Sequence, residues 1–243
     1  MTRDLREALL AYAAATVAVV VLVRAGAQVP LVDRNLGALV AVVFLYVPAA
    51  LAWRRGEELS DYGFTVRPLG KNLGFGLGAP LLLFPLFLFG FVWFYQLICA
   101  QGAPAALARL SPPGMCNRFL GWAQVRMPGL GWPFAEAAFV QVVVVALPEE
   151  LFFRGFLLRR LEQALPPRRR LGGGGIGWAL VASAALFALG HVVVDLDPRR
   201  FAVFFPGLLF GWLRSATGSI AAGTMAHAAS NLYIDLLQKM FFR

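Results

Sequence analysis

The stretch Val142–Arg154 reads Val-Val-Val-Val-Ala-Leu-Pro-Glu-Glu-Leu-Phe-Phe-Arg, and the interpretation of the whole chain depends on it. It places two adjacent carboxylates, Glu149 and Glu150, after twelve uncharged residues. Ionisable groups cost several kcal/mol in hydrocarbon, so they are rare inside membrane helices and usually functional. The stretch therefore predicts a membrane helix that carries a functional site.

The composition supports a membrane protein, because 59% of the 243 residues are hydrophobic and only 14% are charged. A soluble domain usually has about a quarter charged residues. Four uncharged runs are close to or beyond the roughly 17–25 residues of a spanning helix: Ala8–Val23, Asn35–Trp53, Asn72–Ala108 and Leu171–Gly190. We expect an all-α, polytopic transmembrane helix bundle, residues 1–243 forming one transmembrane domain, with seven helices at about 5–24, 36–54, 73–99, 134–164, 176–192, 201–213 and 219–238.

The net charge of +9 would suit a nucleic-acid partner, but the basic residues lie in loops between apolar runs, as in membrane proteins. The predicted partner is a lipid bilayer, with no nucleic acid. Loops on the N-terminal side carry twelve basic residues against nine on the other side, which favours a cytoplasmic N-terminus. The first helix is expected to be retained, because Arg24 directly precedes Ala25-Gly26-Ala27, the one candidate cleavage site.

The only cysteines are Cys99 and Cys116, which excludes a disulfide scaffold and a cysteine-rich metal site. The favoured orientation puts both on the exported side of the membrane. A disulfide can form there, and two unpaired thiols are an equal alternative.

Glu149 and Glu150 point about 100° apart on a helix, so they cannot share one role. Glu150 and Arg154 have i, i+4 spacing and can form an ion pair. Glu149 then faces other helices. Pro148 removes a backbone donor just before both carboxylates and is expected to open the helix locally.

The only two histidines, His191 and His227, also lie in apolar segments, and Asn231 shares a helix face with His227. The helices that carry Glu149 and His191 are joined by a basic turn, 166–175, whose glycines predict flexibility. Glu149 lies about 24 Å and His191 about 22 Å from this turn, at 1.5 Å per residue. His227 lies about 12 Å into its own helix from the same side, so the three groups can converge.

These residue types predict peptide hydrolysis without a covalent intermediate, a metal or another cofactor. A carboxylate such as Glu149 can act as a general base on water. The imidazole of His191 can help to hold that water. His227 and Asn231 can donate to the negative oxygen that develops on the attacked carbonyl.

At these residues the sequence resembles the glutamic intramembrane endopeptidases, also called CPBP or ABI proteins, which include the type II CAAX prenyl endopeptidase. Their pattern is Glu-Glu-x-x-x-Arg, Phe-x-x-x-His and His-x-x-x-Asn/Asp, each on its own helix. The corresponding residues occur in this order within 134–238: Glu149-Glu150-x-x-x-Arg154, Phe187-x-x-x-His191 and His227-x-x-x-Asn231.

The resemblance implies that Glu149 activates water with His191, while His227 and Asn231 stabilise the oxyanion. Glu150, Arg154 and Phe187 would have supporting roles. The family commonly has eight spans, one more than we count. The chain looks closest to the myxosortase branch, bacterial sorting proteases that trim the C-terminal anchors of exported proteins. The implied substrate is a membrane-anchored protein, and the Ala/Arg/Gly-rich composition favours a bacterial inner membrane, where prenylated substrates are not expected.

Simpler and different interpretations stay open. The sole role of Glu149 could be an ion pair with Arg154, and His191 could be a core histidine. His227 and Asn231 could form an interhelical polar contact. A zinc hydrolase could use Glu149, His191 and His227 as ligands, although no His-Glu-x-x-His motif is present. A non-catalytic chaperone or scaffold, or a proton-coupled carrier, would also contain intramembrane charges.

Overall fold

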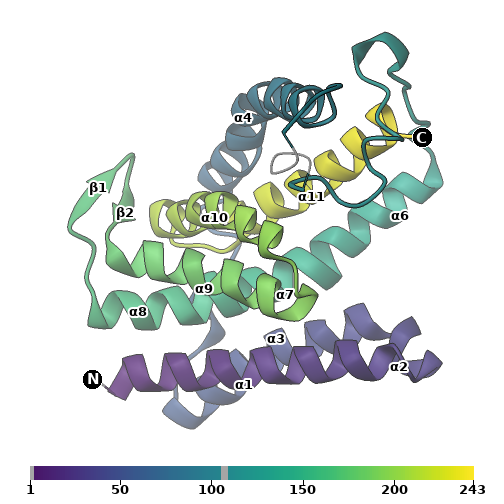
Figure 1. The fold of residues 1–243 in the computed structure, drawn as a ribbon. Coiled ribbons are helices and arrows are strands. Elements are labelled where there is room, and N and C mark those ends of the chain that lie inside the picture. Colours follow the sequence, from purple (N-terminus) through teal and green to yellow (C-terminus); the bar gives the residue numbers. More distant parts are fainter. Residues whose placement is uncertain (1–2, 105–108) are drawn as a thin grey trace.

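The structure, a computed structural model, describes residues 3–104 and 109–243 (Figure 1). The main helices are α1 (Arg3–Gly26), α2 (Pro30–Arg34), α3 (Leu36–Arg55), α4 (Leu69–Ile98), α6 (Trp132–Val140), α7 (Leu147–Glu150), α8 (Leu158–Ala164), α9 (Trp178–Asp195), α10 (Phe204–Thr217) and α11 (Ala221–Phe241). Two π-helical segments, η3 (Gln141–Ala146) and η4 (Leu151–Leu157), join α6, α7 and α8 into one long helix. Short 3-10 turns are η1 (Leu59–Tyr62), η2 (Trp122–Gln124) and η5 (Pro198–Val203), and the two strands are β1 (Arg169–Leu171) and β2 (Gly174–Ile176).

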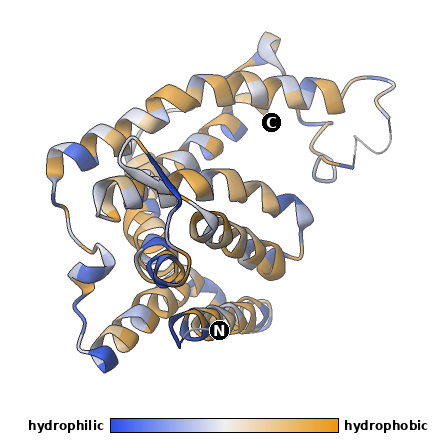
Figure 2. Cartoon of the chain, turned by 90° about the vertical axis from the view of Figure 1, so that its left-hand side faces the viewer, coloured by the Kyte–Doolittle hydropathy of each residue, from blue (hydrophilic) through white to orange (hydrophobic). Residues whose placement is uncertain are grey.

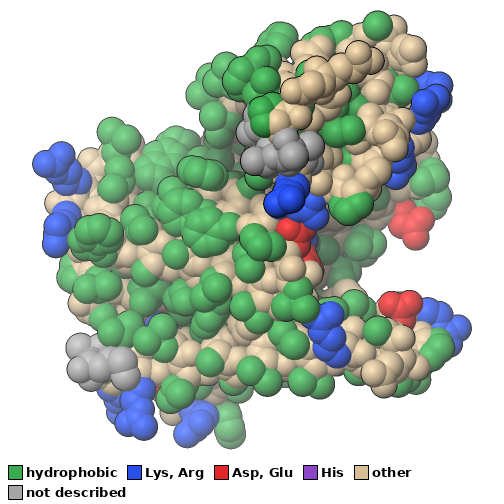
Figure 3. Space-filling model, viewed as in Figure 1, with side chains coloured by type: hydrophobic (Ala, Val, Ile, Leu, Met, Phe, Trp, Pro, Cys, Tyr) green, Lys and Arg blue, Asp and Glu red, His purple; other side chains and the backbone are tan. Residues whose placement is uncertain are grey.

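All seven predicted helices are present, which confirms the all-α bundle. Four of them, α1, α3, α4 and α9, are long and apolar enough to cross a membrane. Large apolar side chains cover the outside of the bundle; Leu81 is 74% exposed and Phe205 70%. Hydrophobic residues line the helices in Figure 2 and much of the visible face in Figure 3. Apolar surface of this extent is typical of a membrane-embedded protein.

The long helix formed by α6 to α8 lies at the centre of the packing. Phe152, Phe153 and Phe156 of η4 are at most 4% exposed. They pack with Tyr12 of α1 and Phe44 of α3, which run side by side along one edge of the bundle (Figure 1). On the other side, α4 packs along α11, and α10 packs against both α9 and α11. The central position of this helix brings its carboxylates within reach of α9, α10 and α11.

The local opening expected at Pro148 takes the form of the two π-helical segments around it. Leu147 N–H donates to the carbonyl of Val142, five residues earlier, and Leu158 N–H donates to that of Phe153. Such segments are rare in proteins as a whole, but those that occur are often found at functional sites. The wider turn changes the direction of the side chains that follow. Glu149 and Glu150 lie between the two.

The predicted turn at 166–175 is present, and its central part is an antiparallel β-hairpin that was not predicted. Strand β1 pairs with β2, with Leu171 opposite Gly174. Gly172 and Gly173 have φ of 56° and 87°, and a two-residue hairpin turn of type I′ requires positive φ at both positions. The side chain of Trp212 on α10 also donates to the carbonyl of Leu171, which fixes the hairpin against the bundle.

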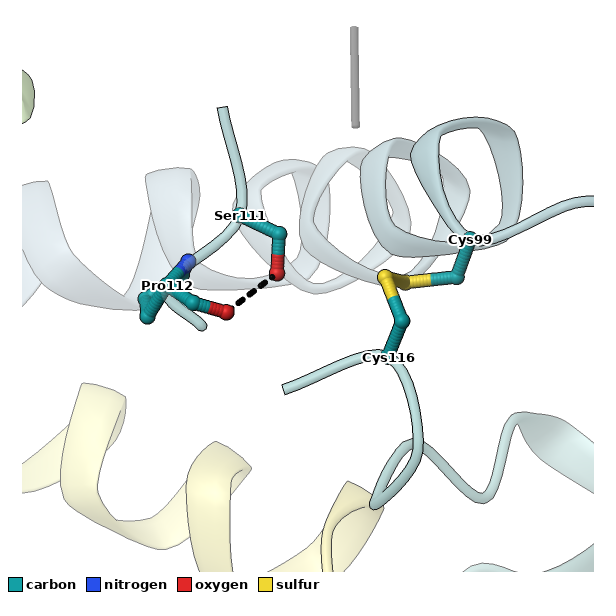
Figure 4. The surroundings of a disulfide bond; sticks show 4 residues. All are labelled: Cys99, Ser111, Pro112 and Cys116. Carbon is teal, nitrogen blue, oxygen red and sulfur yellow. Dashed lines mark hydrogen bonds between the residues drawn. A yellow bond between two sulfur atoms is a disulfide. The ribbon is translucent and has the colours of Figure 1, made fainter. Parts of the chain in front are cut away.

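Cys99 and Cys116 form a disulfide, so of the two alternatives for these residues the structure contains the bonded one (Figure 4). The bond ties the end of α4 to the loop that precedes α6. Phe119 and Phe242 form a β-bridge nearby, which connects the same loop to the end of α11.

Candidate active site

The predicted ion pair between Glu150 and Arg154 is present and fully buried. Arg154 Nη1 lies 2.9 Å from Glu150 Oε1, and the two side chains are 1% and 0% exposed. The guanidinium lies 4.1 Å from the ring centre of Phe187 and donates to the carbonyl of Gly207 at 3.4 Å. Aromatic faces and a carbonyl stabilise a cation that cannot reach water. Arg154 thereby fixes the position of Glu150.

His227 lies between the two glutamates. Its Nδ1 is 3.0 Å from Glu150 Oε1, and its Nε2 is 3.8 Å from Glu149 Oε2. The imidazole stacks on Phe210, with ring centres 4.9 Å apart and planes 18° apart. Glu150 therefore holds one ring nitrogen, and the other faces Glu149 at a distance too long for a direct hydrogen bond.

Glu149 differs from Glu150 in its bonding. Oε2 of each carboxylate lacks a hydrogen-bond partner among the described residues. Oε1 of Glu150 is bonded to Arg154 and His227, whereas Glu149 has no hydrogen bond within the described part of the chain. The side chain of Glu149 is 15% exposed, whereas that of Glu150 is 0% exposed. A buried carboxylate oxygen without a partner costs stability, so such groups are found where a ligand or reactant is bound.

The position of Glu150 also depends on a glycine. A Cβ on Gly223 of α11 would lie 2.7 Å from Glu150 Oε2, closer than real contacts allow. Only a residue without a side chain lets α11 approach the carboxylate this closely. Because His227 follows Gly223 by one helical turn, this close approach helps to bring the imidazole to Glu150.

His191 lies on α9, one turn after Phe187. Its Nδ1 is 2.9 Å from the carbonyl of Phe187. A carbonyl only accepts hydrogen bonds, so Nδ1 carries the proton and Nε2 of the neutral ring is an acceptor. Phe187 contacts the rings of both histidines, with centres 4.6 Å from His191 and 5.9 Å from His227.

Asn231 has a partner that the sequence analysis missed. Its Nδ2 donates to Oε1 of Gln141 at 2.9 Å, so a polar side chain of η3 meets one of α11 inside the bundle. The signal in the sequence was a single amide in the apolar run 137–148, eight residues before Glu149. That spacing puts Gln141 and Glu149 on similar faces of the long helix, but it did not identify Asn231 as the partner.

The structure thus brings Glu149, Glu150, Arg154 and His227 into one buried group, which we call the intramembrane cluster. His191 contacts this cluster through the ring of Phe187, and Asn231 lies one turn beyond His227. No direct polar contact joins Glu149 to His191 or Asn231 among the described residues. Nor do these residues contain a group of three or more histidine, cysteine or acidic side chains arranged to hold a metal ion.

The fold and the cluster define a class: a polytopic helical membrane protein with ionisable side chains buried between its helices. Residues 131–233 match the family model described as type II CAAX prenyl endopeptidase Rce1-like. This match confirms the predicted family, and it covers every residue of the three motifs. No curated protein and no solved structure matches the chain. Over this part of the chain, which is less than half of its length, the match supports a membrane-embedded protease of the CAAX type.

Proposed function

We propose that the protein is a glutamic intramembrane endopeptidase that cleaves a peptide bond near the membrane end of an anchored protein. The observation that carries this proposal is the bonding of Glu149. Its buried Oε2 has no hydrogen-bond partner among the described residues and faces His227 Nε2 at 3.8 Å. Glu150 also has one oxygen without a partner in residues 3–104 and 109–243, but its other oxygen is held by Arg154 and His227. Glu149 is therefore the carboxylate available to react.

The reaction can be written on these residues with the protons balanced. Glu149 accepts a proton from water while the water oxygen bonds to the substrate carbonyl carbon, and the carbonyl oxygen becomes negative. Nε2 of His191 helps to hold the water as an acceptor. The proton on Glu149 then passes to the amide nitrogen, the C–N bond breaks, and a carboxylic acid and an amine leave.

Charge balance supports His227 as a donor to the oxyanion. Two carboxylates and one guanidinium give the cluster a charge of −1 when the imidazole is neutral. When His227 carries a second proton, the net charge of the cluster is zero. Because Glu150 accepts from Nδ1, the Nε2–H of this imidazolium is free to donate to a developing negative oxygen. Asn231 supplies the second donor, and Gln141 positions its amide.

An apolar groove that reaches Ser230, the residue before Asn231, suits a membrane-anchored substrate. It has a volume of about 710 Å³ and lies between α4, α10 and α11. Phe84 and Phe87 line one wall, Leu209 another and Tyr233 the third, and Ser230 places the groove next to Asn231. An anchor segment could enter from the bilayer through this groove. Trimming of C-terminal anchors, as in the myxosortase branch, is the activity we propose.

The decisive experiment uses the full-length protein, co-expressed with epitope-tagged, C-terminally anchored exported proteins. Glu149→Gln should reduce the amount of cleaved product below about 1% of wild type, because loss of a general base costs about 10²–10⁴-fold. Glu136→Gln is the matched control, because Glu136 is an exposed carboxylate on the same long helix. Cleavage by Glu149→Gln above about 1% would contradict the assignment.

A chelator separates the proposed mechanism from a zinc hydrolase with Glu149, His191 and His227 as ligands. Carboxylate chemistry keeps its rate in the chelator, whereas loss and zinc-dependent recovery of cleavage would establish a metalloenzyme. A chaperone or scaffold would instead keep its function in Glu149→Gln.

We also propose that the N-terminus is cytoplasmic in a bacterial inner membrane. The basic loops support this orientation, and so does the disulfide, since disulfides form in oxidising compartments such as the periplasm. In a Cys99→Ser/Cys116→Ser background, a cysteine placed at Gly172 in the hairpin should react with maleimides only from the cytoplasm. Labelling from the exported side would reverse the orientation.

A further inference from the structure

A second groove lies between α1 and α3, away from the intramembrane cluster. It has a volume of about 590 Å³ and is found where α1 begins and α3 ends. Its walls are apolar and its rim is basic. The walls are Leu10, Ala11, Val47, Ala50 and Leu51, and the rim is Arg3, Arg6, Glu7, Arg54 and Arg55.

The acidic side chains near the groove bind only one of its four arginines. Arg55 lies 2.7 Å from Glu7 and 2.8 Å from Asp4. Arg3, Arg6 and Arg54 are exposed, and none has an ion pair within residues 3–104 and 109–243. With four arginines and one glutamate, the lining has a charge of +3. Lys and Arg side chains also gather at this end of α1 in Figure 3, at the lower left.

The arrangement of charge and apolar surface matches a phospholipid rather than a soluble anion. Arg3 precedes Leu10 by seven residues, and Val47 precedes Arg54 by seven. On a helix each separation is about 10 Å. Both helices qualify as membrane spans, so the rim lies at the end of the spans and the walls extend toward the hydrocarbon. A phosphate can lie at the rim while an acyl chain lies along the walls.

We propose that this groove binds one anionic glycerophospholipid, with its phosphate between Arg3, Arg6 and Arg54. Basic pockets between membrane helices are suited to anionic headgroups. A zwitterionic lipid presents no net charge to a lining of +3, so it should bind more weakly. The proposal is independent of the proteolytic mechanism, since no residue of the intramembrane cluster lines the groove.

The test is native mass spectrometry of the purified full chain in detergent, titrated with phosphatidylglycerol or phosphatidylcholine of the same acyl chains. The first phosphatidylglycerol should bind about 10–100-fold more tightly, since each arginine near a headgroup contributes about fivefold. The triple variant Arg3→Gln/Arg6→Gln/Arg54→Gln should lose this preference. Arg168→Gln/Arg169→Gln/Arg170→Gln, which removes three exposed charges from the hairpin, should keep it.

A second variant preserves the test if the triple variant does not fold. Ala50 is exposed on the groove wall, so Ala50→Trp should fill the groove without changing any charge and should also weaken binding. Glycerol 3-phosphate at the same concentration should not compete. The proposal is overturned if wild type shows no preference, if both triple variants lose it equally, or if glycerol 3-phosphate competes as well as the lipid.

Discussion

Arg154 and Arg160 lie six residues apart on the same long helix and are equally buried, but their carboxylate partners are bonded differently. Glu57 accepts from Arg160 with both oxygens, at 3.1 and 2.5 Å, and Tyr62 adds bonds to Glu57 and Arg160. In the intramembrane cluster, Oε2 of Glu149 and Oε2 of Glu150 have no hydrogen bond among the described residues. Both oxygens of Glu57 are therefore hydrogen-bonded, whereas each glutamate of the intramembrane cluster leaves one oxygen without a hydrogen bond in the described part of the chain.

The surroundings explain the difference. Arg160 belongs to what we call the end network, formed with Asp4, Glu7, Arg55, Glu57 and Tyr62 where the spans end. Asp4 is 34% exposed, so water can complete its bonding. Glu7 is 21% exposed, and its buried Oε1 lies 3.8 Å from Arg160 Nε. Glu150 has no such access to water. A charge that is buried without complete bonding is costly, and we attribute this cost to function. The end network is expected to affect stability and the intramembrane cluster to affect activity.

After Glu149→Gln, the largest effect that sharpens this comparison is expected at Asn231. Asn231→Ala should lower kcat by about 10²–10³-fold and leave KM little changed, because the proposed donor acts mainly on the oxyanion. The measurement is steady-state cleavage of the anchored substrate. If KM rises and kcat is unchanged, Asn231 binds substrate and the oxyanion role is wrong.

Gln141 provides an internal check on that result. Gln141→Leu should lower kcat less than Asn231→Ala does, and Gln141→Glu, which retains an acceptor oxygen, should recover part of the loss. If Gln141 acts only through Asn231, the double variant Asn231→Ala/Gln141→Leu should be no slower than Asn231→Ala alone. An additional loss in the double variant would indicate a separate role for Gln141.

The sequence predicts most of the fold and the chemical components of the site. The helix boundaries are close because the apolar runs are long and end at charged loops, as with Arg54 and Arg55 at the end of α3. The pair of Glu150 and Arg154 is predictable because both lie on one helix. The contact of Gln141 with Asn231 is not, because it joins residues 90 positions apart through the packing of two helices.

Two local features of the backbone, the π-helical segments and the β-hairpin, were not predicted from the sequence, for different reasons. The π-helical segment η3 is apolar except for Gln141, and η4 is apolar except for Arg154, so the hydropathy pattern cannot show an extra residue in the turn. The β-hairpin does have a signal, since Gly172–Gly173 suits a type I′ turn. The two further glycines, Gly174 and Gly175, also suit a flexible turn, so the composition does not distinguish the two. In both cases hydrogen bonds of the backbone decide the structure, and the side-chain pattern says little about them.

A moderate effect on stability is expected from Arg160→Gln. The substitution removes a buried guanidinium and leaves the carboxylate of Glu57 with Tyr62 as its partner. The unfolding free energy should fall by about 2 kcal/mol, less than for a fully buried pair because Glu57 is 22% exposed. Thermal unfolding in detergent measures it, with Arg168→Gln, an exposed arginine of the hairpin, as control. Cleavage per folded molecule should be unchanged, and a loss comparable to that of Glu149→Gln would break the comparison.

The smallest effect is expected in the pH dependence of the stability that Glu57 of the end network contributes. Burial raises the pKa of Glu57, but hydrogen bonds from Arg160 and Tyr62 outweigh it and hold this pKa below its ordinary value. A carboxyl whose pKa is lower in the folded state stabilises the fold above its unfolded pKa, and the stabilisation is lost as pH falls through the folded pKa. Wild type should therefore exceed Glu57→Gln in unfolding free energy by about 1 kcal/mol near neutral pH. The difference should shrink below about pH 4, since an unperturbed glutamate titrates near there.

Thermal unfolding of both proteins between pH 3 and 8 measures this difference, and Glu136→Gln should follow wild type throughout. Burial and Glu57 also raise the pKa of Tyr62 to about 12. The phenol therefore stays protonated between pH 3 and 8 and does not contribute to the pH dependence of the unfolding free energy. A pH-independent gap between wild type and Glu57→Gln would mean that packing, rather than charge, makes Glu57 stabilising. The end network would then resemble ordinary core, and the contrast with the intramembrane cluster would rest on Glu149 alone.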